Sequence, residues 1–117
     1  MLRRLVGRWF LVVEVSGPSM LPTLRDGDRV LVRRVHWSAV RTGQIVVLAG
    51  PGSLGLLIKR VAAVPGEPTP PYVPGAPAVV PDGTLVLLSD NRSGGVDSRT
   101  VGLFPTAGLA GVVRRFL

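Results

Sequence analysis

Two residues of this chain have types that could together carry out nucleophilic catalysis, Ser19 and Lys59. Ser19 lies in the stretch Ser16–Leu24, which reads Ser-Gly-Pro-Ser-Met-Leu-Pro-Thr-Leu. Proline fixes its own φ and restricts the residue before it, so Pro18 and Pro22 predict an extended, non-helical backbone around the serine. Such a serine is either a turn residue or a presented nucleophile, and the stretch itself does not decide between the two.

Lys59 is the only lysine of a chain that carries thirteen arginines. An arginine keeps its proton in a protein, whereas a desolvated lysine can lose it. In a strand, Leu57, Lys59 and Val61 point to the same face, and if that face is the core the pKa of the amine falls. A neutral amine could then act as general base toward a serine hydroxyl. The alternative is a surface lysine beside a surface arginine, Arg60, and the residues alone favour this alternative.

The composition excludes or weakens the other common chemistries. The chain has no cysteine, which excludes disulfides, zinc–thiolate sites and cysteine catalysis. A single histidine, His36, argues against a polyhistidine metal site and against a Ser-His-Asp triad. Asp26 and Asp28 flank a glycine and are interpreted as a turn rather than as a catalytic carboxylate pair. We therefore expect neither a metal ion nor a cofactor.

The elements that would position Ser19 and Lys59 are predicted to be strands. The chain has 117 residues, which suits one domain, and its fifteen glycines and eleven prolines argue against long helices. Apolar and β-branched runs predict strands at residues 9–15, 29–35, 45–49, 54–64, 84–88 and 110–116. The run at 45–49 is apolar throughout, which predicts burial on both faces. Seven prolines predict a loop or ribbon-like excursion at 65–83. We expect a mainly β single domain of mixed or antiparallel sheets with little helix.

The net charge of +7 permits attraction to anionic lipid or nucleic acid. The arginines are scattered with few aromatics between them, so no stacking platform for single-stranded nucleic acid is indicated and nucleic acid is not an expected partner. No stretch has the run of about 20 apolar residues that a transmembrane helix needs. Residues 1–4 resemble the basic start of a signal sequence, but Arg8 and Glu14 interrupt the apolar part that follows. We expect a soluble or peripheral chain, either working without an anchor or trimmed of one on its N-terminal side.

Three groups of residues resemble the sequence boxes of type I signal peptidases, the serine proteases of peptidase family S26, and they occur in the family's order. The nucleophile box matches at Ser19-Met20, Pro22-Thr23-Leu24 and Gly27-Asp28; the lysine box at Ile58-Lys59-Arg60-Val61 and Val64-Pro65-Gly66-Glu67; the third box at Asp90-Asn91-Arg92, Asp97-Ser98-Arg99 and Gly102. The resemblance extends over residues 15–113 and includes the only lysine. One box would be weak evidence, whereas three in order are strong.

The resemblance implies an endopeptidase with a Ser-Lys dyad on a largely β catalytic domain. Ser19 would be the nucleophile and Lys59 the general base, and the backbone N–H of Ser19, with the Gly17 region, would hold the oxyanion. The remaining matched residues would shape the site: Met20, Pro22, Arg60, Asp90, Asn91, Asp97, Ser98 and Arg99. The substrate would be a protein or peptide with a signal or leader sequence, bound as an extended strand with small residues such as alanine in its pockets.

Three departures from the family pattern bear on the site. Gly17 replaces a serine whose hydroxyl joins the oxyanion hole in some members, although other members also carry glycine there. Ser89 occupies a position before the Asp-Asn pair that is usually glycine. Gly95 stands where many members have a serine that hydrogen bonds to the lysine amine. We therefore expect Lys59 to be oriented by another group, namely Ser93, Ser98 or a water molecule.

The resemblance also suggests a division of the chain and a location. Residues 1–14 would form a juxtamembrane-like segment with the first strand, and residues 15–117 the catalytic domain. A family-like protein would be membrane-associated, with the catalytic domain on the outer face; an anchorless maturation protease would be cytoplasmic. Trp9 and Phe10 could make a peripheral membrane contact or could be packing residues.

Four alternatives to a general signal peptidase remain open. The chain could be a maturation protease for one client, such as a nickel superoxide dismutase propeptide, because the sequence around Ser19 resembles those processing enzymes too. It could be a catalytically impaired peptide-binding module on the same fold, which the Gly95 departure supports. It could be a basic β-barrel that binds nucleic acid. A self-cleaving repressor relative shares the dyad, but only residues 1–18 precede the serine here.

Overall fold

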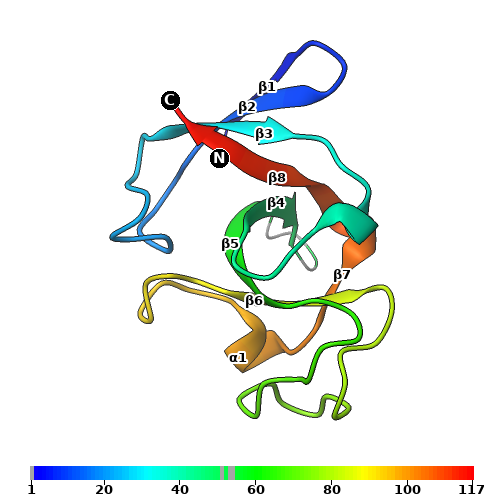
Figure 1. Cartoon of the computed structure of the whole chain (residues 1–117). Helices are drawn as coiled ribbons and strands as arrows, with labels where there is room; N and C mark the ends of the chain where they lie inside the picture. The colour runs from blue at the N-terminus through cyan, green and yellow to red at the C-terminus, as the bar shows by residue number, and fades with distance from the viewer. Residues whose placement is uncertain (1, 51, 53–54) are drawn as a thin grey trace.

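The computed structural model describes residues 2–50, 52 and 55–117, and within them the regular secondary structure is mainly β-strand (Figure 1). The strands are β1 (Leu2–Val6), β2 (Phe10–Glu14), β3 (Arg29–Arg33), β4 (Ile45–Ala49), β5 (Leu56–Ala63), β6 (Thr84–Leu88), β7 (Phe104–Pro105) and β8 (Leu109–Phe116). The helical elements are short: α1 (Ser98–Val101) and the 3-10 turns η1 (Trp37–Ala39) and η2 (Thr106–Gly108). No helix of the described part is long and apolar enough to cross a lipid bilayer. The mainly β prediction is confirmed.

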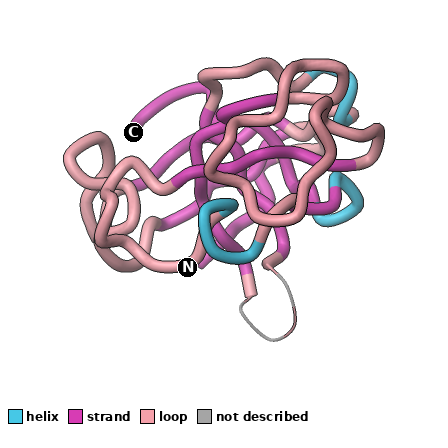
Figure 2. The backbone as a smooth tube through the Cα atoms, turned by 90° about the horizontal axis from the view of Figure 1, so that it is seen from below, coloured by secondary structure: helices cyan, strands magenta, loops and turns pink. Residues whose placement is uncertain are grey.

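The strands form one strongly curled sheet in the order β1-β2-β3-β8-β4-β5-β6-β7, and neighbouring strands run antiparallel (Figures 1 and 2). The last strand of the chain, β8, therefore lies between β3 and β4. The six predicted strands correspond to β2, β3, β4, β5, β6 and β8. β1 was not predicted; it pairs with β2 through a hairpin that turns at Gly7, where φ is +74°.

Two apolar clusters lie on opposite faces of the middle of the sheet. Ile45 and Val47 of β4 belong to the first cluster, with β2, β3 and the segment after β2, whereas Val46 and Leu48 belong to the second, with β6 and β8. This alternation confirms that β4 is buried on both faces. β5 is divided in the same way, because Ile58 belongs to the first cluster and Val61 to the second.

The proline-rich segment 65–83 forms turns and one isolated bridge, between Pro68 and Val79. Val73 and Val80 fasten it to the sheet by packing with Ala63 at the end of β5 and with Val86 of β6. The segment is thus a folded excursion on the β5–β6 end of the molecule, as predicted. The segment between β6 and α1 ends at Asp97, whose side chain caps α1.

Gly111 allows β8 to fit between its two neighbours. A Cβ at this position would collide with the carbonyl oxygen of Arg33 and would lie 2.8 Å from Val32 Cγ1. Gly111 pairs with Val47 of β4 on the other side. The backbones are therefore too close for a side chain at this point of the sheet.

We predict that Gly111→Ala destabilises the protein by about 3 kcal/mol, because β3 must shift to admit the methyl group. Gly108→Ala is the matched control: its Cβ would lie 3.0 Å from the Ala49 carbonyl oxygen and 3.3 Å from Ala49 Cβ, a tight but tolerable fit. Denaturant unfolding of both variants measures the difference. Equal stabilities would contradict the close approach of β3 and β8.

Candidate active site

The segment that carries Ser19 follows β2 and folds as a series of turns. The Leu21 N–H donates to the Pro18 carbonyl at 3.1 Å, and the Leu24 N–H to the Met20 carbonyl at 2.9 Å. The extended path predicted for residues 16–24 is therefore wrong. A proline φ near −65° suits the second position of a turn as well as an extended chain. The two prolines therefore do not distinguish a turn from an extended segment.

The same segment is anchored on both sides of Ser19. Met20 and Leu24 are fully buried in the cluster formed with β2 and β3. The Gly17 N–H donates to Asp26 Oδ1 at 2.8 Å, and the Asp28 carboxylate accepts from the Arg25 N–H, which confirms the Asp-Gly-Asp turn. Pro22 is exposed. Ser19 itself is half-buried and is presented between two fixed points.

Lys59 lies in the interior of the sheet. Its residue is only 3% exposed, and it pairs across the ladder with Val46 of β4. Val46, Val61 and Leu57 all belong to the second apolar cluster, so the amine stem extends along an apolar face. Burial lowers the pKa of Lys59 below its ordinary value of 10.5; attraction to Asp97 opposes this shift and repulsion from Arg99 adds to it. The surface-lysine interpretation is therefore wrong.

The amine of Lys59 donates a hydrogen bond to Ser89 Oγ, 2.8 Å away. The groups expected to orient the lysine do other things: Ser98 Oγ accepts from the Leu87 N–H at 2.9 Å, and Ser93 is exposed. The expectation of Ser93 or Ser98 is thus wrong. Ser89 was noticed in the sequence as an unusual residue before the Asp-Asn pair, but its partner could not be deduced from the sequence. The unusual serine at position 89 was therefore visible in the sequence, but its hydrogen bond to Lys59 was not predicted.

The loop 89–94 connects Lys59 to Ser19. The Asn91 N–H donates to the Ser19 carbonyl at 3.0 Å, and Asn91 Nδ2 donates to the Pro18 carbonyl at 3.0 Å. A Cβ on Gly94 would lie 2.6 Å from Ser19 Cα, so the two backbones are in direct contact. Among the described residues no hydrogen bond joins Ser19 Oγ to Lys59 Nζ. The loop holds both side chains in one neighbourhood, and catalytic contacts in unliganded sites are often long.

Asp90 ties the segment that carries Ser19 to β5, the strand of Lys59. Its carboxylate accepts from Arg60 Nη2 at 2.7 Å and Nε at 3.2 Å, and also from the Thr23 hydroxyl. Burial alone would raise the pKa of Asp90, but the hydrogen bonds from Arg60 and Thr23 and the charge of Arg60 outweigh it, so the pKa lies below its usual value. The ion pair thus fixes one end of the 89–94 loop.

Asp97, which follows the loop, holds its first residue, Ser89. It accepts from the Ser89 N–H at 3.0 Å and from the Arg99 side chain at 2.6 Å, and its side chain caps α1 through the Arg99 N–H. Burial acts to raise the pKa of Asp97, but the hydrogen bonds from Arg99 and from the Ser89 and Arg99 backbone outweigh it and lower the pKa. Asp97 is buried and shapes the loop on which Ser89 is carried.

Two backbone N–H groups were candidates for binding an oxyanion, those of Gly17 and Ser19. The Gly17 N–H is already used by Asp26. The Ser19 N–H has no hydrogen-bond partner among the described residues, so it is free to donate. Gly17 has a φ of +83°, and a Cβ there would meet nothing within 4 Å.

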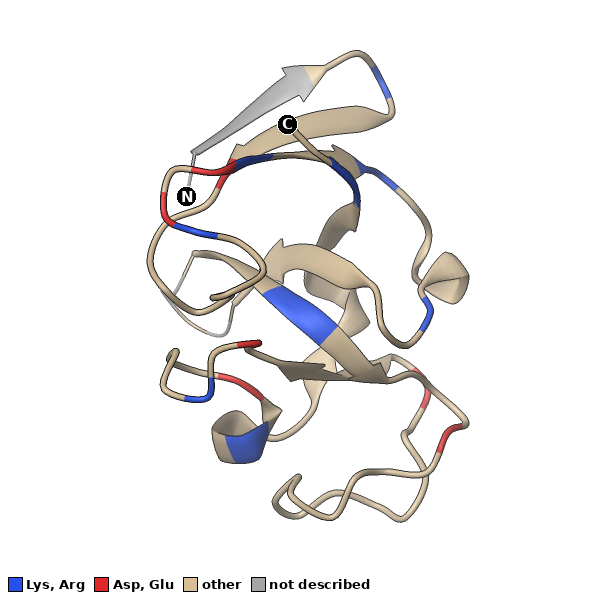
Figure 3. Cartoon of the chain, turned by 60° about the vertical axis from the view of Figure 1, so that its left-hand side comes forward, with Lys and Arg blue, Asp and Glu red and all other residues tan. Residues whose placement is uncertain are grey.

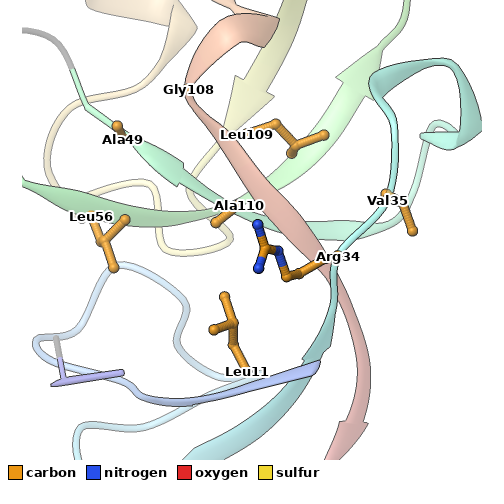
Figure 4. Close-up of a pocket in the computed structure, with 8 residues that line it drawn as sticks. All are labelled: Leu11, Arg34, Val35, Ala49, Leu56, Gly108, Leu109 and Ala110. Atoms are coloured by element: carbon orange, nitrogen blue, oxygen red, sulfur yellow. The ribbon is translucent and has the colours of Figure 1, made fainter. Parts of the chain in front are cut away.

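Two hollows involve the segments that carry Ser19 and Lys59. One is lined by Gly17, Pro18, Leu21, Pro22, Arg25 and Asp26, immediately beside Ser19. The other lies between β2, the end of β3 and the starts of β5 and β8, where Leu11, Arg34, Leu56 and Ala110 converge (Figure 4). Neither Ser19 nor Lys59 lines the second hollow, but Leu56 belongs to the same strand as the lysine.

Comparisons with known proteins show what the chain as a whole is similar to. The profile of the family described as "Signal peptidase, peptidase S26" matches residues 3–69 and 67–117. The chain is 32% identical to the probable signal peptidase I-1 of Synechocystis sp., a match that covers 87% of this chain and 69% of the relative. It is 35% identical to the mitochondrial inner membrane protease subunit 1 of Schizosaccharomyces pombe, covering 82% of this chain and 66% of the relative. The chain thus spans about two thirds of the length of these relatives.

We predict that the burial of Lys59 makes stability depend on pH in the alkaline range. The folded protein releases the lysine proton at a lower pH than the unfolded chain, so between the two pKa values the unfolded state binds more protons. The free energy of unfolding therefore rises with pH through that window, by about 1.4 kcal/mol per pH unit, and levels off near 10.5.

Thermal unfolding of the parent and of Lys59→Met between pH 6 and 11 measures this effect. The variant should be the more stable protein at neutral pH, with an advantage that disappears toward pH 10.5. Arg115→Gln, which removes an exposed cation, is the control and should follow the parent. Because the chain has a single lysine, ¹³C NMR of lysine-labelled protein gives the pKa of Lys59 directly; an ordinary value would contradict the structure.

Proposed function

Since the chain belongs to the signal peptidase family, peptidase S26, we propose that it is a serine endopeptidase that cleaves signal or leader peptides after small residues. Ser19 is the nucleophile and Lys59 the general base of this proposal. The observation that carries it is the buried amine of the only lysine, held beside the nucleophile segment by one hydrogen-bonded loop. A buried ammonium with only a structural role would be costly to keep.

The proposed reaction follows the usual order of acyl transfer. The neutral Lys59 amine takes the hydroxyl proton of Ser19 as Oγ attacks the scissile carbonyl carbon. The free Ser19 N–H donates to the oxyanion that forms. Lys59 then gives the proton to the leaving amine as the peptide bond breaks. The same amine then takes a proton from a water molecule, which attacks the acyl-enzyme carbonyl; as the bond to Ser19 Oγ breaks, Lys59 returns that proton to Oγ.

A free strand edge supports an extended peptide as substrate. β5 pairs with β6 only from Arg60 onward, so in the described part of the chain Leu56–Lys59 have no neighbouring strand on that side. A peptide that adds to this edge runs past Lys59 toward Leu56, about 10 Å away. Leu56 also lines the hollow of Figure 4, which would receive residues of the peptide further from the cleaved bond.

We predict that Ser19→Ala and Lys59→Arg each reduce cleavage of a peptide with an Ala-x-Ala site by about 10² to 10⁴-fold. The first variant lacks the attacking hydroxyl, and the arginine of the second cannot lose its proton to act as a base. Ser38→Ala, an exposed serine in η1, is the control and should retain parental activity. Mass spectrometry of the products measures both rate and position. Parental cleavage by Lys59→Arg would exclude the dyad. Peptide binding without cleavage by the parent would favour the impaired peptide-binding module, which the missing Ser19–Lys59 contact allows.

A second part of the proposal concerns the membrane. The tip of the β1–β2 hairpin exposes Val6 (46%) and Trp9 (61%), and the Arg8 guanidinium lies 5.6 Å from the Trp9 ring centroid. Arg33 and Arg34 lie beside Trp9 at the end of β3. Aromatic and apolar side chains beside arginines suit the surface of an anionic bilayer. Elsewhere the charged positions are spread over many elements (Figure 3), which does not suit a nucleic-acid surface.

We therefore propose that the hairpin tip rests on a membrane and that, as the family resemblance implies, the catalytic domain lies on the outer face. The double variant Val6→Ser/Trp9→Ser should bind vesicles of phosphatidylglycerol and phosphatidylcholine about tenfold more weakly than the parent in cosedimentation. Val79→Ser, which removes an equally exposed apolar side chain (52%) from the proline-rich excursion, is the matched control. Unchanged binding by the double variant would exclude the hairpin tip as the membrane contact, and absence of binding by the parent would favour the cytoplasmic alternative.

A further inference from the structure

Ser89 lies one residue beyond β6 and is only 5% exposed. Its hydroxyl is placed between the amine of Lys59, at 2.8 Å, and the carbonyl of Gly94, at 3.1 Å. We propose that Ser89 is the positioning residue of Lys59, the group that aims the amine at Ser19. This inference rests on the proposed Ser-Lys mechanism and adds to it a residue whose position the family pattern usually fills with glycine.

The directions of the two hydrogen bonds determine how Ser89 can interact with the Lys59 amine. The Gly94 carbonyl can only accept, so the single hydroxyl proton of Ser89 is committed to it. Ser89 Oγ can therefore only accept from Lys59. A neutral amine that donates one N–H to Ser89 keeps its lone pair free for the proton of the nucleophile. A hydroxyl that donated to the amine would instead occupy that lone pair and block general-base catalysis.

Ser89 is itself held from several sides. Its N–H donates to Asp97 Oδ2 at 3.0 Å, and the Arg60–Asp90 ion pair fixes the next residue. Gly94, which accepts the Ser89 proton, is in backbone contact with Ser19. The hydroxyl that orients the base is thus bonded to the residue that supports the nucleophile. A shift of the loop would move both groups together.

The alternatives for this role fail on geometry. Gly95 has a φ of +90°, and a Cβ there would meet nothing within 4 Å, so a side chain at 95 would enter open space. Ser98 Oγ is engaged by the Leu87 N–H. Ser93 is exposed. Among the described residues, Ser89 is the hydroxyl that reaches the amine.

The charged groups that act on Lys59 are Asp97 and Arg99, which form an ion pair with each other and affect the amine in opposite directions. Removing the Ser89 hydroxyl leaves both in place. It removes an acceptor that favours the ammonium form, so the lysine should lose its proton at a still lower pH. The two effects of the substitution, misorientation and a lower pKa, are therefore separable by experiment.

The test compares the parent with Ser89→Ala, Ser89→Cys, Ser93→Ala and Lys59→Arg. For Ser89→Ala we expect kcat to fall about 10- to 100-fold, less than the loss for Lys59 itself, with KM within about twofold of the parent. The acid limb of the kcat/KM profile and the ¹³C NMR titration of the single lysine should both move to lower pH. Ser93→Ala should match the parent in all three measurements.

Each outcome has a defined meaning. Ser89→Cys keeps the size of the side chain but is a weak acceptor, so it should behave like Ser89→Ala and decides the question if the alanine variant does not fold. A Ser89 variant with parental kcat and an unmoved lysine titration would overturn the positioning role while leaving the dyad intact, provided Lys59→Arg is inactive. An active Lys59→Arg would instead show that the proposed function is at fault.

Discussion

The structure depends on one costly arrangement, a lysine amine buried inside a curled β-sheet. Lys59 is carried on β5 opposite Val46 and is surrounded by the apolar cluster of β4, β6 and β8. Desolvation disfavours the ammonium and lowers the pKa of Lys59, whereas the charge of Asp97 acts to raise that pKa and the charge of Arg99 to lower it. The amine is desolvated because the second apolar cluster covers the face of β5 that carries Lys59.

The 89–99 segment holds the buried amine of Lys59 and the segment that carries Ser19 in one neighbourhood. Asp90 bonds to Arg60 of β5 and to Thr23, four residues after Ser19, whereas Asp97 bonds to Arg99 and to the Ser89 backbone. Neither carboxylate touches Ser19 or Lys59 by a hydrogen bond in the described chain. Their ionised forms are favoured in the fold, as their lowered pKa values indicate once burial is outweighed by hydrogen bonding. Their role is to hold a short loop against two other segments of the chain.

Sequence patterns predicted the features that depend on local chain order and missed those that depend on tertiary contacts. The apolar run of β4 and the face shared by Leu57, Lys59 and Val61 follow from strand periodicity, and the structure has both. β1 was missed because its sequence, Leu-Arg-Arg-Leu-Val, has no strand pattern of its own and is ordered by pairing with β2. The turns around Ser19 were missed because a proline φ suits both turn and strand. The partner of Ser89 lies thirty residues away, and no local pattern encodes that contact.

The relation between positions 89 and 95 shows how one requirement can be met from two places in a loop. The loop folds back so that Ser89 Oγ bonds to the Gly94 carbonyl, which brings its start next to the residue before Gly95. A hydroxyl near either end of such a loop can approach the same amine, provided the local backbone points it inward. Here Gly95 has a left-handed φ and faces open space, so the inward direction belongs to residue 89. What the fold fixes is the place of an acceptor beside a buried amine, and the sequence position that supplies it is free to change.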